Sequence, residues 1–214
     1  MKNIFTTAAS FKYRWLLFSA VVFFLYGCYP DGGEYVEDFD AVYTNYEQDF
    51  SFNTTYTYSI PDKVMDLDDS EEGDPEYIDQ VYADAILNTV KANLDAMGWT
   101  EVSANSNPEI VVVAATFDQT FIYYNPWWWD WYYPWYGPGW GWYYPGYYPG
   151  YVSGYSSGSV LVQMTYPEDT NSDNEVPVVW LGALNGLLQG SESNIVGRIT
   201  TGLNTAFNHP PFNN

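Results

Sequence analysis

The chain has 214 residues, with 27 acidic and six basic side chains, and its formal net charge at pH 7 is −21. A surface of this sign repels phosphate backbones, so we expect no binding to nucleic acid. The single cysteine excludes a disulfide framework.

The N-terminal segment 1–27 predicts a cleavable signal peptide. It holds three of the six basic residues and no acidic residue. Residues 15–25 form an apolar core of 11 residues, which suits a signal peptide and is shorter than the roughly 20 residues of a transmembrane helix. An uncleaved N-terminal anchor is the alternative interpretation.

The apolar core ends at Leu25-Tyr26-Gly27-Cys28, which resembles the lipobox of bacterial lipoproteins. The resemblance implies cleavage after Gly27 and attachment of lipid to Cys28, the first residue of the mature protein. Several acyl chains on one residue anchor a protein stably to a membrane. Tyr29 stands where an aspartate often retains lipoproteins in the inner membrane. We therefore expect an outer-membrane location, with the domain facing the periplasm or the cell surface.

The mature chain begins with a short connecting segment. Residues 28–40 are polar, acidic and contain glycine, which predicts a tether. Residues 41–211 are long enough for one domain with its own core. Within this domain, apolar and polar side chains alternate over 52–60, which predicts a strand. Six acids among the nine residues 66–74 predict a solvated loop.

Two amphipathic helices are predicted. The first runs from Pro75 to about Met97, because proline suits a first helical position and Gly98 suits a helix end. The second begins after Ser191 or Ser193. We expect each helix to bury one apolar stripe: Ala83, Ile86, Leu87, Val90, Leu94 and Met97 in the first, and Ile195, Ile199, Leu203 and Phe207 in the second.

Three more strands complete the predicted domain. Residues 109–117 are so apolar that we expect a central strand buried on both faces, continuing toward 121–124. Residues 160–166 and 178–184 are expected to pair as an antiparallel hairpin. This element order predicts an α+β fold, with an antiparallel or mixed sheet and two helices on one face.

A long loop rich in Trp, Tyr, Gly and Pro is predicted over 125–158. Aromatic residues make up 19 of the 35 positions from 121 to 155, and the prolines among them oppose regular strand pairing. We expect no strand or helix in this loop. We expect it to dock on the domain near Pro126 and Ser159, and to be poorly ordered over much of 137–158, where seven glycines stand among 22 residues.

Six short motifs occur in an order that resembles a bacterial envelope lipoprotein family called domain of unknown function 4136. They are 49–58 (DFSFNTTYTY), 94–99 (LDAMGW), 108–112 (PEIVV), 158–162 (GSVLV), 179–182 (VWLG) and 207–210 (FNHP). The resemblance covers about 38–211. It implies the fold and an envelope location, and it brings no catalytic residues with it.

The inventory of reactive side chains predicts no catalytic site, so we do not expect an enzyme. The only histidine, His209, precedes two prolines near the C-terminus, and Cys28 is assigned to the lipid, so nucleophilic catalysis lacks its usual base. Nothing singles out one pair of carboxylates for glycoside hydrolysis. We also expect no cofactor.

One acidic connector bears on metal binding. Asp169, Asn171 and Asp173 match the first three ligand positions of an EF-hand loop, but Asn174 replaces the required glycine and Trp180 the bidentate glutamate. Turn connectors are commonly rich in Asp and Asn. We therefore predict a hairpin connector without a metal site, and calcium binding remains the alternative.

The aromatic run 127–135 is the feature that predicts a function, because large exposed apolar patches usually bind a partner. Such rings stack on sugars, enter membrane interfaces or pack on protein, and folding back over the sheet is the structural alternative. We predict a non-enzymatic binding or structural module that uses this aromatic-rich loop, with an envelope protein or a glycan as the candidate partner at the loop. The alternatives are a glycan such as peptidoglycan and, less favoured, a calcium-dependent adhesion or assembly role. The candidate binding residues are Trp127, Trp128, Trp129, Trp131, Tyr132 and Trp135.

Overall fold

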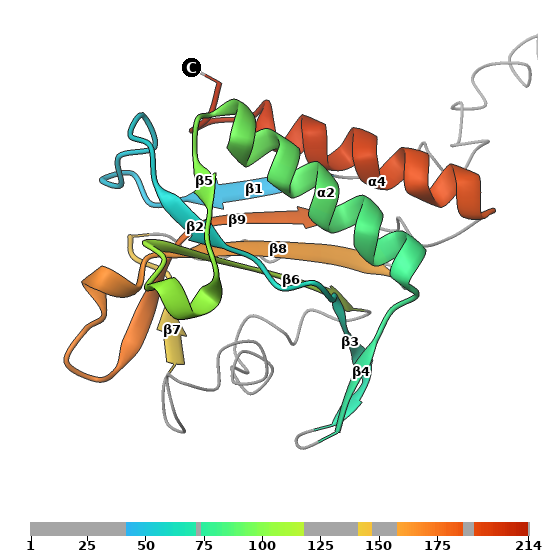
Figure 1. Ribbon diagram of the computed structural model, residues 1–214, viewed down its shortest axis with the longest axis horizontal. Helices are drawn as coiled ribbons and strands as arrows, with labels where there is room; N and C mark the ends of the chain where they lie inside the picture. Colours follow the sequence, from blue (N-terminus) through green and yellow to red (C-terminus); the bar gives the residue numbers. More distant parts are fainter. Residues whose placement is uncertain (1–41, 72–73, 118–140, 147–157, 186–190, 214) are drawn as a thin grey trace, which may run out of the picture. The chain divides into compact units, whose positions relative to one another are not determined.

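The computed structural model describes residues 42–71, 74–117, 141–146, 158–185 and 191–213 (Figure 1). These residues form a mixed sheet of nine strands with two α-helices, which confirms the predicted α+β class. The elements are β1 Val42–Tyr46, β2 Thr57–Ser59, β3 Met65–Glu71, β4 Asp74–Tyr77, α2 Gln80–Ala96, β5 Thr100–Glu101, β6 Ile110–Phe117, β7 Gly141–Tyr143, β8 Ser159–Thr165, β9 Glu175–Leu184 and α4 Glu192–Phe207.

The centre of the sheet consists of three long antiparallel strands. The main strand order is β1-β9-β8-β6-β2-β5, with β3 beside β6, β4 beside β3 and β7 beside β9. Every residue of β6 and of β8 is buried, so the predicted central strand is confirmed. The predicted β8–β9 hairpin is also confirmed, with Val160 opposite Leu184.

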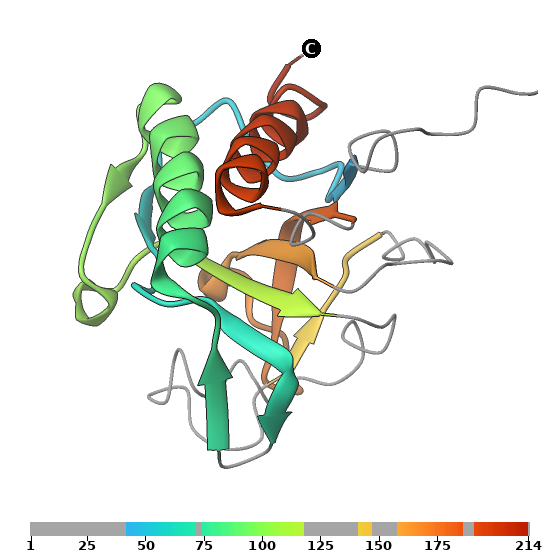
Figure 2. The same ribbon diagram turned by 90° about the vertical axis from the view of Figure 1, so that its right-hand side faces the viewer.

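Both helices cover the same face of the sheet (Figures 1 and 2). The predicted stripes are buried in both, apart from Met97, which caps α2 and is only partly buried. Burying each large apolar side chain contributes about 1.5–3 kcal/mol, so these stripes fix the helices on the sheet. Neither helix of the described segments is long and apolar enough to cross a membrane.

The end of α2 follows its sequence signal. Gly98 has φ +82°, the left-handed conformation that ends helices. A Cβ there would also lie 3.3 Å from Cγ2 of Thr55. Trp99 then turns back, and its backbone N–H donates to the carbonyl of Leu94 at 3.1 Å.

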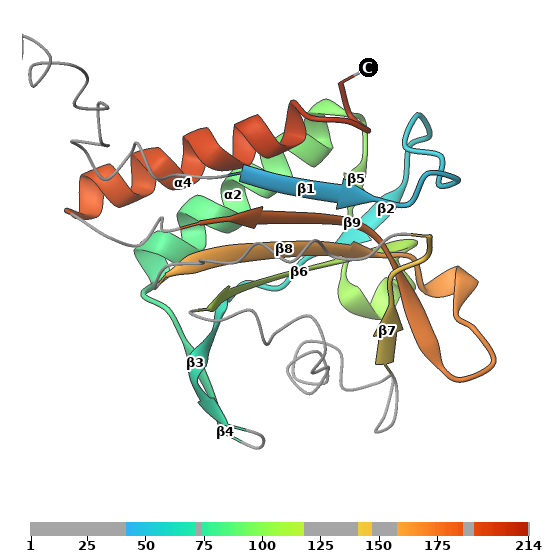
Figure 3. The same cartoon turned by 180° about the vertical axis from the view of Figure 1, so that it is seen from behind.

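The prediction for the acidic segment and the start of α2 was wrong. Instead of a solvated loop, Met65–Glu71 and Asp74–Tyr77 form an antiparallel hairpin that projects from the sheet, as Figure 3 shows from behind. Its base is held because Met65 is fully buried and pairs with Ala115 of β6. Since the chain to Tyr77 is extended, α2 begins only at Gln80 rather than at Pro75.

The long strand predicted over 52–60 is also shorter than expected. Only Thr57–Ser59 pairs in the sheet, parallel to both β5 and β6. The residues before it turn, and the hydroxyl of Tyr56 donates to the carbonyl of Ser51 at 3.0 Å. The alternating aromatic residues therefore pack on one another instead of lining one face of a strand.

Candidate functional site

The residues predicted to carry function lie outside the part of the chain that the structure describes. They are the cleavage site Gly27, the lipidation site Cys28 and the aromatic residues Trp127, Trp128, Trp129, Trp131, Tyr132 and Trp135. The predicted continuation of β6 to 121–124 also lies outside it. The structure defines the scaffold of the aromatic segment 118–157. It shows the strand after which the segment begins, the strand before which it ends, and one point between them at which it is held.

The two ends of this segment stand side by side on the most buried strands. Phe117, the last residue of β6, is paired with Ser159, the first residue of β8, and both side chains are fully buried. The Ser159 hydroxyl donates to Oδ1 of Asn185 at 3.1 Å. The aromatic segment therefore starts and ends at the same end of two paired central strands, a position suited to presenting a loop.

A third point of attachment lies within the segment. Gly141–Tyr143 forms β7, which pairs in parallel with the first residues of β9, Gly141 standing opposite Glu175. Trp142 is only 9% exposed and belongs to the apolar core on the sheet face away from the helices. The prediction that 125–158 holds no strand and docks only near its ends was wrong here. An indole buries enough area to offset the entropy that the neighbouring glycines lose on ordering.

The residue after β7 makes a polar contact with the same sheet face. The Nε2 amide of Gln163 donates to the hydroxyl of Tyr144 at 2.7 Å. Gln163 lies in the middle of β8 and is fully buried, and its Oε1 has no hydrogen-bond partner among the residues that the structure describes. A buried glutamine in an apolar core is costly unless it is bonded, so this bond helps to fix Tyr144 on the sheet.

Carboxylates gather beside β7. Burial raises the pKa of Tyr143, and the charges of Glu47, Asp169 and Glu175 raise it further. Burial likewise raises the pKa of Glu47, with added repulsion from Asp169 and Asp49. The edge of the sheet that holds the aromatic segment is thus strongly negative.

We expect Glu47→Gln to raise Tm at pH 7 by about 1–2 °C, since changes of surface charge typically alter the free energy of unfolding by about 0.5 kcal/mol. The folded-state pKa of Glu47 is raised above the value of 4.5 for the free side chain. The stability that this carboxyl contributes is therefore complete below pH 4.5 and is lost as the pH rises through the folded value.

The gain in Tm should accordingly disappear at pH 4, which thermal melts at the two pH values would check. Asp62→Asn removes the same charge at an exposed position and is the control. An equal gain from Asp62→Asn would mean that net charge, not the surroundings of Glu47, is responsible.

The structure also brings together four of the six family-like motifs, which sequence reasoning had not connected. The rings of these motifs, together with Tyr166 and Phe212 from outside them, form one aromatic cluster at the end of the sheet beneath the C-terminus of α4, with centroids 4.7–6.2 Å apart. The aromatic cluster consists of Phe50, Phe52, Tyr56, Trp99, Tyr166, Trp180, Phe207 and Phe212. Each well-placed ring pair adds about 0.5–1.5 kcal/mol beyond its burial. The shared signal was that each of these motifs contains an aromatic residue.

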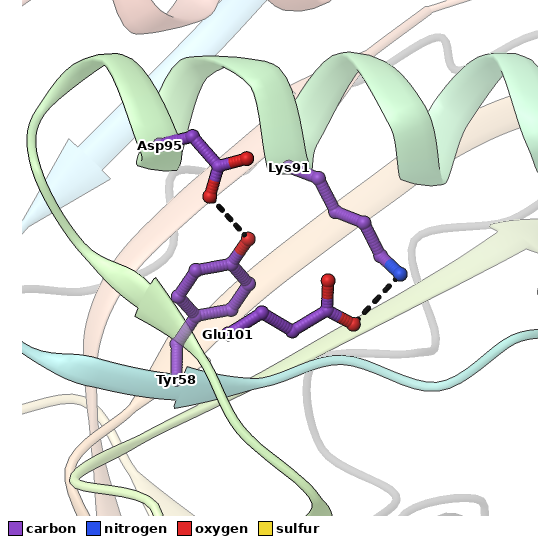
Figure 4. Close-up of polar contacts among 4 residues, drawn as sticks. All are labelled: Tyr58, Lys91, Asp95 and Glu101. Carbon is purple, nitrogen blue, oxygen red and sulfur yellow. Dashed lines mark hydrogen bonds and ion pairs between the residues drawn. The ribbon is translucent and has the colours of Figure 1, made fainter.

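Polar contacts close this end of the domain around the cluster. The Tyr58 hydroxyl donates to Oδ1 of Asp95 at 3.0 Å, and Nζ of Lys91 pairs with Oε1 of Glu101 at 2.7 Å (Figure 4). These bonds join β2 and β5 to α2. Burial and the bond to Asp95 raise the pKa of Tyr58. The hydrogen bond of Tyr166 to Glu168, followed by burial, raises the pKa of Tyr166 to about 12.

The structure places the EF-hand-like residues in the β8–β9 connector. Oδ1 of Asn171 accepts the backbone N–H groups of Asp173 and Glu175, at 2.9 and 3.0 Å, and Nδ2 of Asn171 donates to Oε2 of Glu175 at 2.8 Å. These contacts build a side-chain-capped turn. Among the described residues, no group of three or more His, Cys, Asp or Glu side chains is arranged to hold a metal ion.

The only histidine has a structural contact. Nδ1 of His209 lies 3.4 Å from the hydroxyl of Thr44 on β1, at the end of α4. Its near neighbours in the sequence, Phe207 and Phe212, pack on each other in the aromatic cluster. Its position fits a role in docking the C-terminus on β1.

Comparisons with known proteins match most of the described domain to one protein family. A family model described as domain of unknown function (DUF4136) matches residues 42–212. The chain is similar to the crystal structure of a DUF4136 family protein from Bacteroides thetaiotaomicron VPI-5482, with 29% identity and a TM-score of 0.62 over 81% of this chain and 96% of that chain. A PelC dodecamer from Paraburkholderia phytofirmans has 11% identity and a TM-score of 0.36, covering 77% and 94%. No curated protein matches the chain.

Proposed function

The chain belongs to the DUF4136 family, and we propose that it is a lipid-anchored, non-enzymatic module of the bacterial cell envelope that binds a partner through its aromatic-rich segment. Family membership identifies the domain and leaves its biochemical role open. The proposal therefore rests on the scaffold and on the side chains that the sequence places on it.

The observation that carries the proposal is the three-point attachment of the aromatic segment. It starts at Phe117, is held at Trp142 and ends at Ser159, all on one sheet. A rigid scaffold that presents a long segment of unusual composition is the usual arrangement of a binding loop. The run 127–135, with five tryptophans and two tyrosines, lies between the first two attachment points.

We favour an envelope protein as the partner and keep a glycan as the second candidate. Tryptophan and tyrosine dominate the energetic centres of protein interfaces, and they also stack on sugar faces. Negative charge beside β7, from Glu47 and its neighbours, suits a partner that is neutral or basic at its rim. A calcium-dependent role has less support, because Asn171 uses its side chain to build the turn.

Replacing Trp127, Trp129 and Trp131 together by alanine should weaken binding by about 30-fold or more, since losing an aromatic hot spot typically costs at least about 2 kcal/mol. The measurement is retention on purified peptidoglycan sacculi, together with cross-linking in intact envelopes. Tyr77→Ala removes an exposed ring elsewhere and is the control. Unchanged retention on sacculi would eliminate the glycan candidate, and unchanged cross-linking would eliminate the protein partner.

Cys28→Ser should release the protein from the membrane fraction. Without the thiol no diacylglycerol can be attached. Because the acyl chains are the proposed membrane anchor, nearly all of the variant should move from the membrane fraction to the soluble fraction. Palmitate labelling followed by separation of inner and outer membranes checks both the anchor and its location. Continued labelling of the variant, or wild-type protein found in the inner membrane, would contradict the corresponding part of the proposal.

A further inference from the structure

We infer that the outer surface of the two helices contains a second docking site, which receives a short basic amphipathic helix of a partner protein. The site is a groove of about 450 Å³ between α2 and α4. None of its lining residues belongs to the stripes that α2 and α4 bury against the sheet, and none belongs to the aromatic segment.

The groove is built from residues spaced by one helical turn. Its walls are Val81, Asp84, Ala85, Asn88, Thr89 and Ala92 of α2 and Val196, Thr200 and Asn204 of α4. The two helices run in roughly the same direction across the sheet (Figure 1). One end is closed by Nδ2 of Asn93, which donates to Oδ1 of Asn204 at 2.8 Å.

The lining of the groove is mostly apolar although it contains two threonines. The hydroxyl of Thr89 donates to the carbonyl of Ala85 at 2.7 Å, and that of Thr200 donates to the carbonyl of Val196 at 3.0 Å. Both hydroxyls are thus bonded to their own helix. At the open end stands Val81, which is 40% exposed, one of two large apolar side chains exposed in the described segments.

The dimensions of the groove suit a helix. From Val81 to Ala92 the groove follows 12 residues of α2, and at a rise of 1.5 Å per residue the distance between the two ends is about 17 Å, or three turns. A groove between two helices receives the ridge of a third helix, with apolar anchors one turn apart. The alanine and threonine side chains that line the groove are small, so such a ridge can approach the two helices closely.

Charge decides which helix fits. Asp84 is the one charged wall residue, and Glu192 stands on the same outer surface of α4. The basic side chains of the two helices are directed elsewhere, because Lys91 pairs with Glu101 and Arg198 is buried. A second copy of the chain would set acid against acid, whereas a helix with lysine or arginine beside its apolar ridge would complement the site.

The test uses purified protein and a synthetic three-turn helical peptide that has a leucine ridge flanked by lysines, with a matched peptide in which glutamates replace the lysines. We expect saturable binding of the lysine peptide by fluorescence anisotropy in about 0.15 M salt, where long-range attraction is screened. Ala92→Phe fills the groove and should lower affinity at least tenfold. Asp84→Lys should lower it about fivefold and should favour the glutamate peptide.

Two variants provide matched controls for charge and size. Asp173→Lys makes the same charge change in the exposed β8–β9 connector, and Thr201→Phe adds a ring at an exposed site of α4 that does not line the groove. Both should keep full affinity. Equal losses in these controls, equal binding of the two peptides, or no saturable binding would each overturn the inference. So would a dimer in sedimentation that Ala92→Phe dissociates, because the occupant would then be a second copy.

Discussion

Trp180→Ala is expected to lower the free energy of unfolding by about 3–5 kcal/mol, the range typical for deleting a buried tryptophan. Trp180 is the largest fully buried side chain in the described segments. Its ring packs on Phe207 and Phe212, with centroids 5.2 and 5.5 Å away. The substitution thus removes the contact between the sheet and the C-terminal residues, in addition to the ring itself.

Trp180→Phe is the matched comparison for this prediction. The indole Nε1 is buried without an acceptor in the described segments, and phenylalanine removes this unpaired donor while keeping an aromatic ring. We therefore expect Trp180→Phe to cost less than half as much as Trp180→Ala. Urea denaturation with a constant m-value would give both numbers. Equal costs would show that the ring size, not the aromatic packing, determines stability at this position.

Gly182→Ala is expected to lower the free energy of unfolding by about 1–3 kcal/mol, the usual cost of overpacking a core. A Cβ at Gly182 would lie 2.5 Å from the Cη2 atom of Trp180. The indole cannot swing away freely, because Phe207 and Phe212 hold its other side. The motif 179–182 therefore needs a glycine because the Trp180 ring leaves no room for a Cβ, and not because the backbone adopts a conformation that only glycine tolerates.

A double-mutant cycle separates this cause from a general intolerance of substitution. Phenylalanine at position 180 lacks the distal indole atoms, so Gly182→Ala should cost at least 1 kcal/mol less in a Trp180→Phe background, within the roughly 0.5–3 kcal/mol seen for contacting residues. Additive effects of the two substitutions would refute the steric explanation. Gly197→Ala is a control, since its added Cβ would meet no described atom within 4 Å beyond its chain neighbours and the nearby backbone of α4.

These results would assign a structural role to the motifs that resemble the family. Trp180, Gly182 and Phe207 meet in the aromatic cluster, and Trp99 joins it through Tyr56 at 5.1 Å. The indole Nε1 of Trp99 also donates to the carbonyl of Thr54 at 3.1 Å. Four of the motifs therefore stabilise one end of the scaffold, whereas we propose that the segment between β6 and β8 and the groove between the helices bind partners.

The candidate site was predictable from the sequence only in part. Composition alone pointed to the aromatic segment, because its rings cannot all be buried within one loop. Composition could not place β7, since a buried Trp142 and an exposed tryptophan look alike in a run of glycine and proline. The groove between α2 and α4 left no sequence signal either, because its walls consist of ordinary small helical residues.

The sequence by itself determined those elements in which the spacing of apolar residues matches a single kind of secondary structure. The apolar run of β6, the β8–β9 hairpin and the stripe of α4 can each be buried in only one way, so local pattern and final structure agree. Tertiary structure decided the elements whose local pattern opposes their final state. The acidic residues after Met65 form a strand because β6 offers backbone partners at Ala115 and Thr116. In such places the backbone hydrogen bonds to the neighbouring strand and a buried side chain such as Met65 outweigh the low strand propensity of the local residues. These contacts come from residues distant in the chain, so the local sequence does not reveal them.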